Sequence, residues 1–297
     1  MTDKNPSIGI VIVNYNGAKY QNAAIKTIKE QTYQNYQIVV VDSASTDDSV
    51  ELLVEAYGED VTVLREKENC GFAAGSNIGI RYCLEHGADY ILLLNNDVEL
   101  DSLLLENLVA DADENTVVVP KIYFYEPSDR IWAAGGILNW NHCETKHYGI
   151  EEKDIGQCDE RQYVNFAPAC CMLLHRSVFE RVGYFDEAFF MYYEDTDLCV
   201  RLLENGYQIL YEPEARMWHK VSSSSGGQNS KVSVYYIYRN QLHFMKKHSD
   251  KARFRGRCYA VLKAMTKAVT APIRRKNDGV IFTAYLDYLK GKMYRKR

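Results

Sequence analysis

Polar residues of the kinds that bind nucleotides and metals follow three apolar runs in the first hundred residues. In chain order they are Asn14 and Asn16, then Asp42 and Ser43, then Asn95, Asn96 and Asp97. The runs before them are 8–13, 37–41 and 90–94, each apolar on both faces like a strand covered by helices. Because the carboxyl ends of parallel strands collect ligands, we expect these side chains to meet at one rim of a sheet.

Asp97 is a candidate metal ligand. It stands directly behind the strand-like run 90–94, so a rigid element would deliver its carboxylate to the rim, with the amides of Asn95 and Asn96 beside it. Mg²⁺ or Mn²⁺ bridging a diphosphate needs such a hard oxygen ligand and few other protein groups, because the phosphates supply the rest. A strand-ending turn rich in Asn and Asp is the structural alternative.

Asp42 is a candidate contact for a nucleobase or ribose, and turn or capping chemistry is its alternative. The stretch 69–77 runs from Asn69 to Asn77 and places Gly71 just before a predicted helix, where backbone N–H groups can approach phosphate. A plain helix-start loop is the alternative there. The spacing fits neither G-x-G-x-x-G nor a P-loop, which disfavours dehydrogenases and ATPases.

Three carboxylates, Glu194, Asp195 and Asp197, begin a predicted helix immediately after the aromatic stretch 189–193. Aromatic rings can face sugars and exclude water, and burial near apolar groups raises a carboxylate pKa towards that of a working base. Acidic residues are also favoured in a first helical turn by the helix dipole, which is the alternative. His219 follows another strand-like run and becomes a metal ligand only if the fold brings it to Asp97.

The hydrophobic periodicity predicts how these residues are positioned. The predicted strands are 8–13, 37–41, 61–66, 90–94, 117–125, 163–175 and 208–211, and the predicted helices are 23–31, 49–57, 75–86, 194–205 and 232–248. Strands and helices alternate in the first half, as in a parallel sheet, whereas 117–178 is strand-rich and suits acceptor binding. The Ser/Gly-rich stretch 221–230 predicts a mobile loop, and 251–270 and 280–293 predict amphipathic helices on either side of Pro272.

Charge divides the chain into an acidic body and a basic end. The net charge is −5, yet residues 251–297 hold 14 Lys or Arg against 2 Asp. Such an extension suits anionic lipid better than nucleic acid, because no nucleic-acid motif accompanies it; a helix pair packed on the body is the alternative. Eight scattered cysteines, no signal-peptide pattern and no apolar run of membrane-spanning length predict a cytoplasmic protein with free thiols.

Taken together, residues 7–248 resemble the inverting glycosyltransferases of family 2, in particular their rhamnosyltransferase-like bacterial branch. The resemblance rests on motifs in a specific order: V-I-V-N-Y-N-G, V-V-D-S-A-S-T-D, N-C-G-F-A-A-G-S-N-I-G, L-L-L-N-N-D, G-Y-F-D-E-A-F-F-M-Y-Y-E-D-T-D-L-C-V-R, W-H-K and Y-Y-I-Y-R-N. It implies an α/β fold of GT-A type, with a Rossmann-like, mostly parallel mixed sheet flanked by helices. The implied domains are 1–248, with a nucleotide-binding half to about 115 and an acceptor-binding half from about 116, and a basic helical extension, 249–297.

The resemblance also implies roles for individual residues. Asp97 matches the last Asp of the family's D-x-D metal motif, and His219 would complete the metal site. Asp195 would be the catalytic base, with Glu194 in reserve, and Asp42 and the Asn14 region would hold the nucleotide. Asn95 at the first position of D-x-D is a departure that removes one negative charge. A second departure is Ala167-Pro168-Ala169-Cys170-Cys171, where relatives usually have small Gly or Ala residues facing the acceptor.

The function implied is transfer of rhamnose or a hexose, with inversion, from a nucleotide-diphosphate sugar in bacterial surface polysaccharide synthesis. The donor would be dTDP-rhamnose or a UDP-sugar, the acceptor a glycan or polyprenyl-linked sugar, and the cofactor Mg²⁺ or Mn²⁺. The basic extension could place the enzyme on the inner face of the cytoplasmic membrane. Two alternatives are a non-catalytic nucleotide- or carbohydrate-binding protein on a degenerate scaffold and a sugar nucleotidyltransferase.

Overall fold

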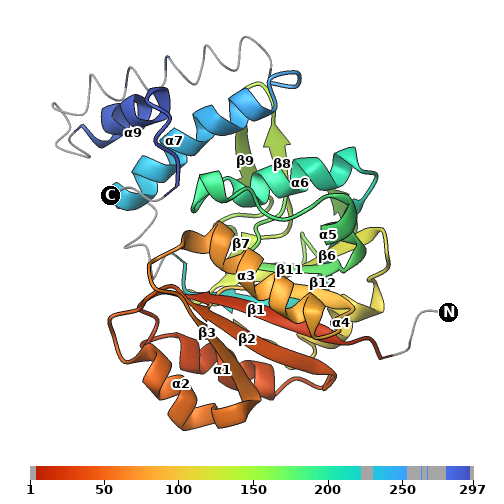
Figure 1. Ribbon diagram of the computed structural model, residues 1–297. Coiled ribbons are helices and arrows are strands. Elements are labelled where there is room, and N and C mark those ends of the chain that lie inside the picture. The colour runs from red at the N-terminus through yellow and green to blue at the C-terminus, as the bar shows by residue number, and fades with distance from the viewer. Residues whose placement is uncertain (1–4, 222–229, 253–261, 263–265, 267–278, 295–297) are drawn as a thin grey trace.

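The computed structural model describes residues 5–221, 230–252, 262, 266 and 279–294 (Figure 1). Its centre is a mixed ten-stranded sheet in the order β10-β12-β6-β11-β4-β1-β2-β3, with β5 paired to β12 and β7 paired to β6. Helices α1, α2 and α4 pack on one face of this sheet, and α3, α5 and α6 pack on the other. The predicted α/β fold with a sheet flanked by helices is therefore confirmed.

The first half of the chain follows the predicted alternation of strands and helices. Its elements are β1 (Ile8–Asn14), α1 (Gln21–Lys29), β2 (Tyr36–Asp42), α2 (Ser49–Tyr57), η1 (Gly58–Asp60), β3 (Val61–Arg65), α3 (Gly71–Glu85) and β4 (Tyr90–Leu94). Strands β1 to β4 run parallel, and the pairing sets Asn14 opposite Asp42. The apolar runs form central strands because helices cover both of their faces.

The second half was predicted less completely. Its elements are β5 (Val98–Leu100), α4 (Leu104–Ala110), β6 (Thr116–Phe124), β7 (Ile131–Ala133), β8 (Gly136–Asn139), β9 (Glu144–His147), β10 (Gln162–Val164), β11 (Cys171–His175), α5 (Ser177–Arg181), η2 (Glu187–Phe189), α6 (Glu194–Glu204) and β12 (Gln208–His219). The predicted strand 163–175 is two strands, and β12 continues well past residue 211. A bulge between Glu212 and Arg216 accommodates Pro213, so the strand resumes after it and reaches His219.

Two further helices pack together beyond the sheet. Helix α7 (Lys231–Lys247) begins at Ser230, whose hydroxyl accepts the Ser233 N–H at 3.0 Å. Helix α9 (Val280–Leu289) lies beside it in Figure 1, so the alternative in which the extension packs on the body holds for this segment. Most of the predicted helix 251–270 and of the loop 221–230 lies outside the described residues. Among the described helices, none combines the length and the apolar character that a membrane span requires.

Helix α3 approaches the sheet closely through Gly79. A Cβ atom at this position would lie 2.4 Å from Cγ1 of Val11 on β1 and 3.2 Å from Cγ2 of Val41 on β2. Glycine is therefore required for space rather than for its backbone freedom. This contact fixes the distance between α3 and the strands that end at the rim.

We expect Gly79→Ala to lower the free energy of unfolding by about 1–3 kcal/mol, because the new methyl overpacks a core that has no room for it. Urea denaturation measures the change. Adding Val11→Ala should recover part of the loss, because it removes the side chain that the new methyl meets. Additive losses in the double variant would contradict this account.

Candidate active site

The side chain of Asn14 connects the three predicted rim clusters. It is fully buried at the end of β1, and its amide nitrogen lies 3.0 Å from Asp42 Oδ1 and 2.9 Å from Ser49 Oγ. Its oxygen accepts a 2.9 Å hydrogen bond from Nδ2 of Asn96. The prediction that these side chains lie close together at one rim of the sheet is therefore confirmed. Asn14 makes its hydrogen bonds inside the protein and therefore organises the rim.

The loop after β2 curls around Asp42. The N–H of Ser45 donates to Asp42 Oδ2 at 3.1 Å, and the Asn16 side chain accepts the Thr46 N–H at 2.8 Å. Ser43 is buried, with its hydroxyl 3.1 Å from Sγ of Cys70. These contacts hold the predicted nucleotide-binding loop in one conformation beside the rim.

Asp97 and His219, 122 residues apart, come together in the structure. Pairing of β12 with β5 sets His219 opposite Val98, and Nε2 of His219 lies 3.0 Å from Oδ1 of Asp97. Adjacent ligands of an octahedral Mg²⁺ with ~2.1 Å bonds stand about 3 Å apart, so this pair fits two neighbouring positions around such a cation. Nδ2 of Asn95 is 3.3 Å from the same imidazole nitrogen, and reversing the amide would present its oxygen instead.

Two aromatic residues beside His219 had no signal in the sequence. The ring of Trp132 on β7 meets the His219 ring edge-on at 4.8 Å, and His147 on β9 lies 4.8 Å from Trp132. Burial, with His219 nearby, lowers the pKa of His147 to about 4, so its ring is neutral at pH 7. The buried ring nitrogens Trp132 Nε1, His147 Nδ1 and His219 Nδ1 have no hydrogen-bond partner in the described structure, so polar ring nitrogens line the surroundings of His219.

Glu194 and Asp195 begin α6 in a protein environment that disfavours charge. Burial raises the pKa of Asp195 to about 6, although hydrogen bonds from Thr196 oppose the shift. Burial, and then the charge of Asp195, raises the pKa of Glu194 well above its usual range, which favours its neutral form. The charges of Asp97 and Asp195 both raise the pKa of the buried Cys170 thiol, after burial itself, so both carboxylates lie within electrostatic reach of Cys170.

A strained loop delivers Asp195 to this place. Phe190, Tyr192 and Tyr193 have φ angles of 65°, 67° and 73°, in the left-handed region that disfavours residues other than glycine. Each such residue costs about 1–2 kcal/mol, and a strained backbone of this kind persists only where its surroundings determine it. We call residues 188–193 the base loop.

The first turn of α3 contacts the base loop. Oδ1 of Asn69 accepts the Gly71 N–H at 2.9 Å, and a Cβ on Gly71 would lie 2.6 Å from the carbonyl oxygen of Phe190. The buried Asn77 side chain bonds the backbone of Phe185 in both directions and donates to Glu187 at 2.9 Å. The Asn77 amide is therefore engaged in packing, and the prediction that the stretch 69–77 approaches the donor rests on its backbone N–H groups.

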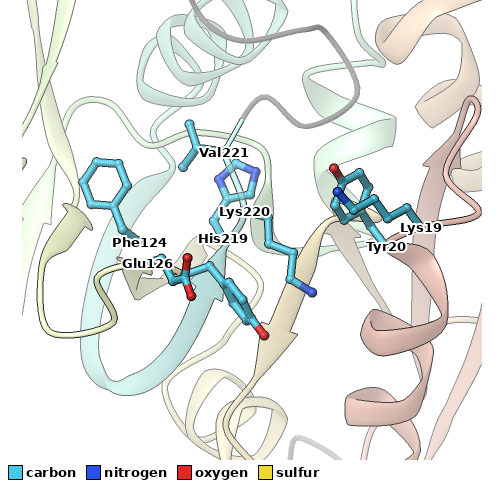
Figure 2. Close-up of a pocket in the computed structure, with 8 residues that line it drawn as sticks. Lys19, Tyr20, Phe124, Glu126, His219, Lys220 and Val221 are labelled. Carbon is cyan, nitrogen blue, oxygen red and sulfur yellow. The ribbon is translucent and has the colours of Figure 1, made fainter.

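A cavity of about 550 Å³ opens beside His219 (Figure 2). Lys19 and Tyr20, which precede α1, lie across it from Glu126, His219 and Lys220. Nζ of Lys220 donates to Glu99 at 2.7 Å. Lysines that line a cavity suit an anionic ligand. The sequence patterns did not identify Lys19 or Tyr20.

The order of these elements and the position of their polar residues match a known family. Residues 9–183 match the family described as glycosyl transferase family 2. The chain belongs to this family. The protein is therefore a glycosyltransferase of the hexosyltransferase type, as the motifs predicted.

Two named relatives are similar to this chain over a region that is longer than the family match at residues 9–183. The dTDP-rhamnosyl transferase RfbF of Shigella flexneri is 30% identical over 256 residues, which cover 82% of this chain and 81% of the relative. The N-acetylglucosaminyl-diphospho-decaprenol L-rhamnosyltransferase of Mycobacterium tuberculosis is 26% identical over 250 residues, covering 76% and 79%. The rhamnosyltransferase-like assignment of this family 2 chain is confirmed.

Solved glycosyltransferases share the fold. GalNAc-T7 with UDP, GalNAc and Mn²⁺ aligns with a TM-score of 0.63 and 18% identity, over 80% of this chain and 48% of that chain. The mannosyltransferase PcManGT from Pyrobaculum calidifontis, in complex with GDP-Man and Mn²⁺, aligns with a TM-score of 0.59 and 17% identity, over 97% and 88%. At these identities the likeness establishes the GT-A architecture.

We expect Asn14→Ala to lower the free energy of unfolding by about 1–3 kcal/mol, because Asp42, Ser49 and Asn96 lose a buried partner. The rim should also bind nucleoside diphosphates more weakly. Urea denaturation and calorimetric titration measure the two effects. Asn107→Ala, which removes one exposed hydrogen bond to the Glu214 carbonyl, is the control and should change neither by much. Equal behaviour of the two variants would contradict the organising role of Asn14.

Proposed function

We propose that this glycosyltransferase moves a sugar from a nucleotide-diphosphate donor to an acceptor hydroxyl by direct displacement, with inversion at the anomeric carbon. The observation that carries the proposal is the pairing of two kinds of polar group in one site. Asp195, a carboxylate whose pKa is about 6, and Asp97, which contacts His219, both act electrostatically on the same buried thiol, that of Cys170. A base and a diphosphate site are what this reaction requires.

The donor occupies the rim in this proposal. The nucleoside lies along the loop that holds Asn16, Asp42 and Ser43, and its diphosphate lies towards Asp97, with the N–H groups around Asn69 and Gly71 nearby. The names of the relatives favour dTDP-rhamnose as donor, with UDP-sugars second. Lys19 and Lys220 at the cavity mouth support an anionic ligand there.

Asp97 and His219 hold a divalent cation, Mg²⁺ or Mn²⁺, in this proposal, and Asn95 adds its amide oxygen after reorientation. The 3.0 Å separation of the two ligand atoms supports it. When bound, such a cation stabilises negative charge on the departing diphosphate. Because Asn95 stands where a carboxylate would add a negative charge, we expect the site to bind the cation more weakly in the absence of the nucleotide.

Asp195 removes the proton from the acceptor hydroxyl as that oxygen attacks the donor sugar. Glu194, which burial keeps largely neutral, adds no second negative charge beside it and leaves Asp195 as the base. The acceptor enters from the second half, residues 116–248. Trp132, His147 and Cys170 form its side of the site.

The acceptor is a glycan or a polyprenyl-linked sugar, and the protein works at the inner face of the cytoplasmic membrane. The name of the mycobacterial relative, which includes a diphospho-decaprenol, supports a lipid-linked acceptor. On α9 and just after it, Phe282 and Leu289 are 59% and 75% exposed, and Lys290 and Lys292 follow. Exposed apolar side chains beside lysines suit the interface of an anionic bilayer.

His219→Ala should abolish the metal-dependent part of nucleotide binding, because it removes one of the three proposed protein ligands, Asp97, His219 and Asn95. Thermal shift with dTDP and with UDP, each with and without Mn²⁺, measures the effect. Wild-type protein held at 100 times the Kd of a ligand gains about 2.7 kcal/mol. A variant that keeps the full Mn²⁺-dependent shift would exclude His219 as a ligand.

Turnover should rise with pH through about 6 and level off above it, because Asp195 accepts a proton only when ionised and burial raises its pKa to about 6. Below that pH the group is protonated and the rate falls. Asp195→Asn should reduce the rate by about 10²–10⁴-fold and remove this pH dependence while donor binding persists. Release of the nucleoside diphosphate measures the rate. A folded variant that retains wild-type turnover would overturn the assignment of the base.

A further inference from the structure

We propose that α7 and α9 form a brace that sets the position of the catalytic base, with Arg239 and Asn240 as positioning residues and the backbone of Tyr294 as the distal support. The inference rests on the proposed role of Asp195. It gives the C-terminal segment 279–294 a part in catalysis that is separate from any contact with a membrane.

The amide of Asn240 holds the base loop from one side. Asn240 is fully buried in α7, and its Nδ2 lies 2.8, 2.8 and 2.7 Å from the carbonyl oxygens of Phe189, Met191 and Tyr192, so that its two N–H groups serve three acceptors. These carbonyls lie in and around the left-handed stretch of the loop. A single side chain thus binds three of the peptide groups whose unusual orientation brings Asp195 into the site.

Arg239 extends this hold to the end of the described chain. It is also fully buried, and its guanidinium donates to the carbonyl oxygens of Ala188 and Phe189 at 2.9 and 2.8 Å and to that of Tyr294. Its Nε donates to Oδ1 of Asn240 at 2.9 Å, which orients the amide. The two side chains therefore form one hydrogen-bonded unit with the base loop and Tyr294.

Helix α9 keeps Tyr294 in place. The N–H of Tyr294 donates to Ala188 at 3.3 Å, so the C-terminal segment also contacts the base loop directly. Ile281 and Ala284 of α9 are buried against α7, and the hydroxyl of Tyr235 on α7 donates to Asp287 on α9 at 3.0 Å. Figure 1 shows the two helices side by side above the sheet.

The other end of α7 holds the helix that carries the base. Lys247 and His248 each approach Oδ1 of Asp197 to 2.9 Å, and Asp197 lies two residues after Asp195 on α6. Lys247 also donates to Asp186, before the base loop, at 2.8 Å. The backbone on both sides of Asp195 is thus fixed to α7.

The physical reason for such a brace is the strain in the base loop. Phe190, Tyr192 and Tyr193 are non-glycine residues with left-handed backbone. Such backbone returns to an ordinary conformation unless the surrounding structure prevents it. Relaxation would move Asp195 relative to the acceptor oxygen, whereas Asn14 and Asp42, which are held by hydrogen bonds within the first half of the chain, would keep their positions. The rate should therefore suffer without a matching loss of donor binding, since a displacement of about 1 Å can cost about 100-fold in rate.

The first test compares Asn240→Asp with wild type in donor hydrolysis, followed as release of nucleoside diphosphate from dTDP-rhamnose or the best UDP-sugar. The substitution keeps the size of the side chain but replaces the donating NH₂ with an oxygen facing three carbonyls. We expect kcat to fall about 100-fold with KM for the donor little changed. Wild-type kcat, or a loss confined to KM, would overturn the proposal. Val232→Ala, at an exposed position of α7, is the control and should behave as wild type.

The second test uses two chains that differ by two residues. A chain ending at Tyr294 keeps an acceptor oxygen for Arg239, in its terminal carboxylate, and should retain wild-type kcat. A chain ending at Lys292 lacks that partner and should show the same loss as Asn240→Asp. The assay contains no membrane, so anchoring cannot account for a difference. Equal rates in the two chains would overturn the role of Tyr294. A wild-type protein that binds but never turns over any donor would instead refute the proposed function, which keeps the two failures apart.

Discussion

The site depends on the position of β4 at the junction of two kinds of strand pairing. On one side β4 runs parallel to β1, and on the other it pairs antiparallel with β11, where Leu94 stands opposite Cys171. Just past the strand, the N–H of Asn95 donates to the Cys170 carbonyl at 3.0 Å. Residues 95–97 therefore lie between the nucleotide-binding loops and the strands of the second half. Open α/β sheets bind ligands where their strand order changes, and here this geometry brings the Asp97 carboxylate to that place.

The carboxylates of the site have different surroundings. Asp42 accepts hydrogen bonds from Asn14 and Ser45, and Asp97 contacts His219, so both have polar side-chain partners. Asp195 lacks a cationic partner among the contacts described and is held in surroundings that raise its pKa to about 6. This difference in surroundings supports the proposed roles, in which Asp195 is the base and Asp97 a metal ligand, because a base needs a pKa near the working pH.

Sequence patterns predicted what depends on neighbours in the chain. Strands β1, β2 and β4 end where the apolar runs end, so the rim residues Asn14, Asp42 and Asp97 were placed correctly. Sequence patterns did not predict contacts between segments that are far apart in the chain. Trp132 meets His219, and His147 meets Trp132, across long stretches of sequence, and the Asn77 side chain bonds the backbone of Phe185, 108 residues away. β12 was cut short because Pro213 looks like a strand end until a bulge in a paired strand accommodates it.

The buried polar unit of Arg239 and Asn240 is costly for a protein to keep. Apolar residues of similar size would pack without the desolvation that a guanidinium requires, and burial does lower the pKa of Arg239. Such a unit is retained where the orientation of the bonded groups matters more than the strength of their attraction. Apolar packing cannot select the orientation of a peptide carbonyl, whereas an N–H group can, and the base loop has carbonyls in orientations that ordinary backbone avoids. The fold therefore places its least favourable backbone against its most directional side chains, and both lie next to the residues that begin α6.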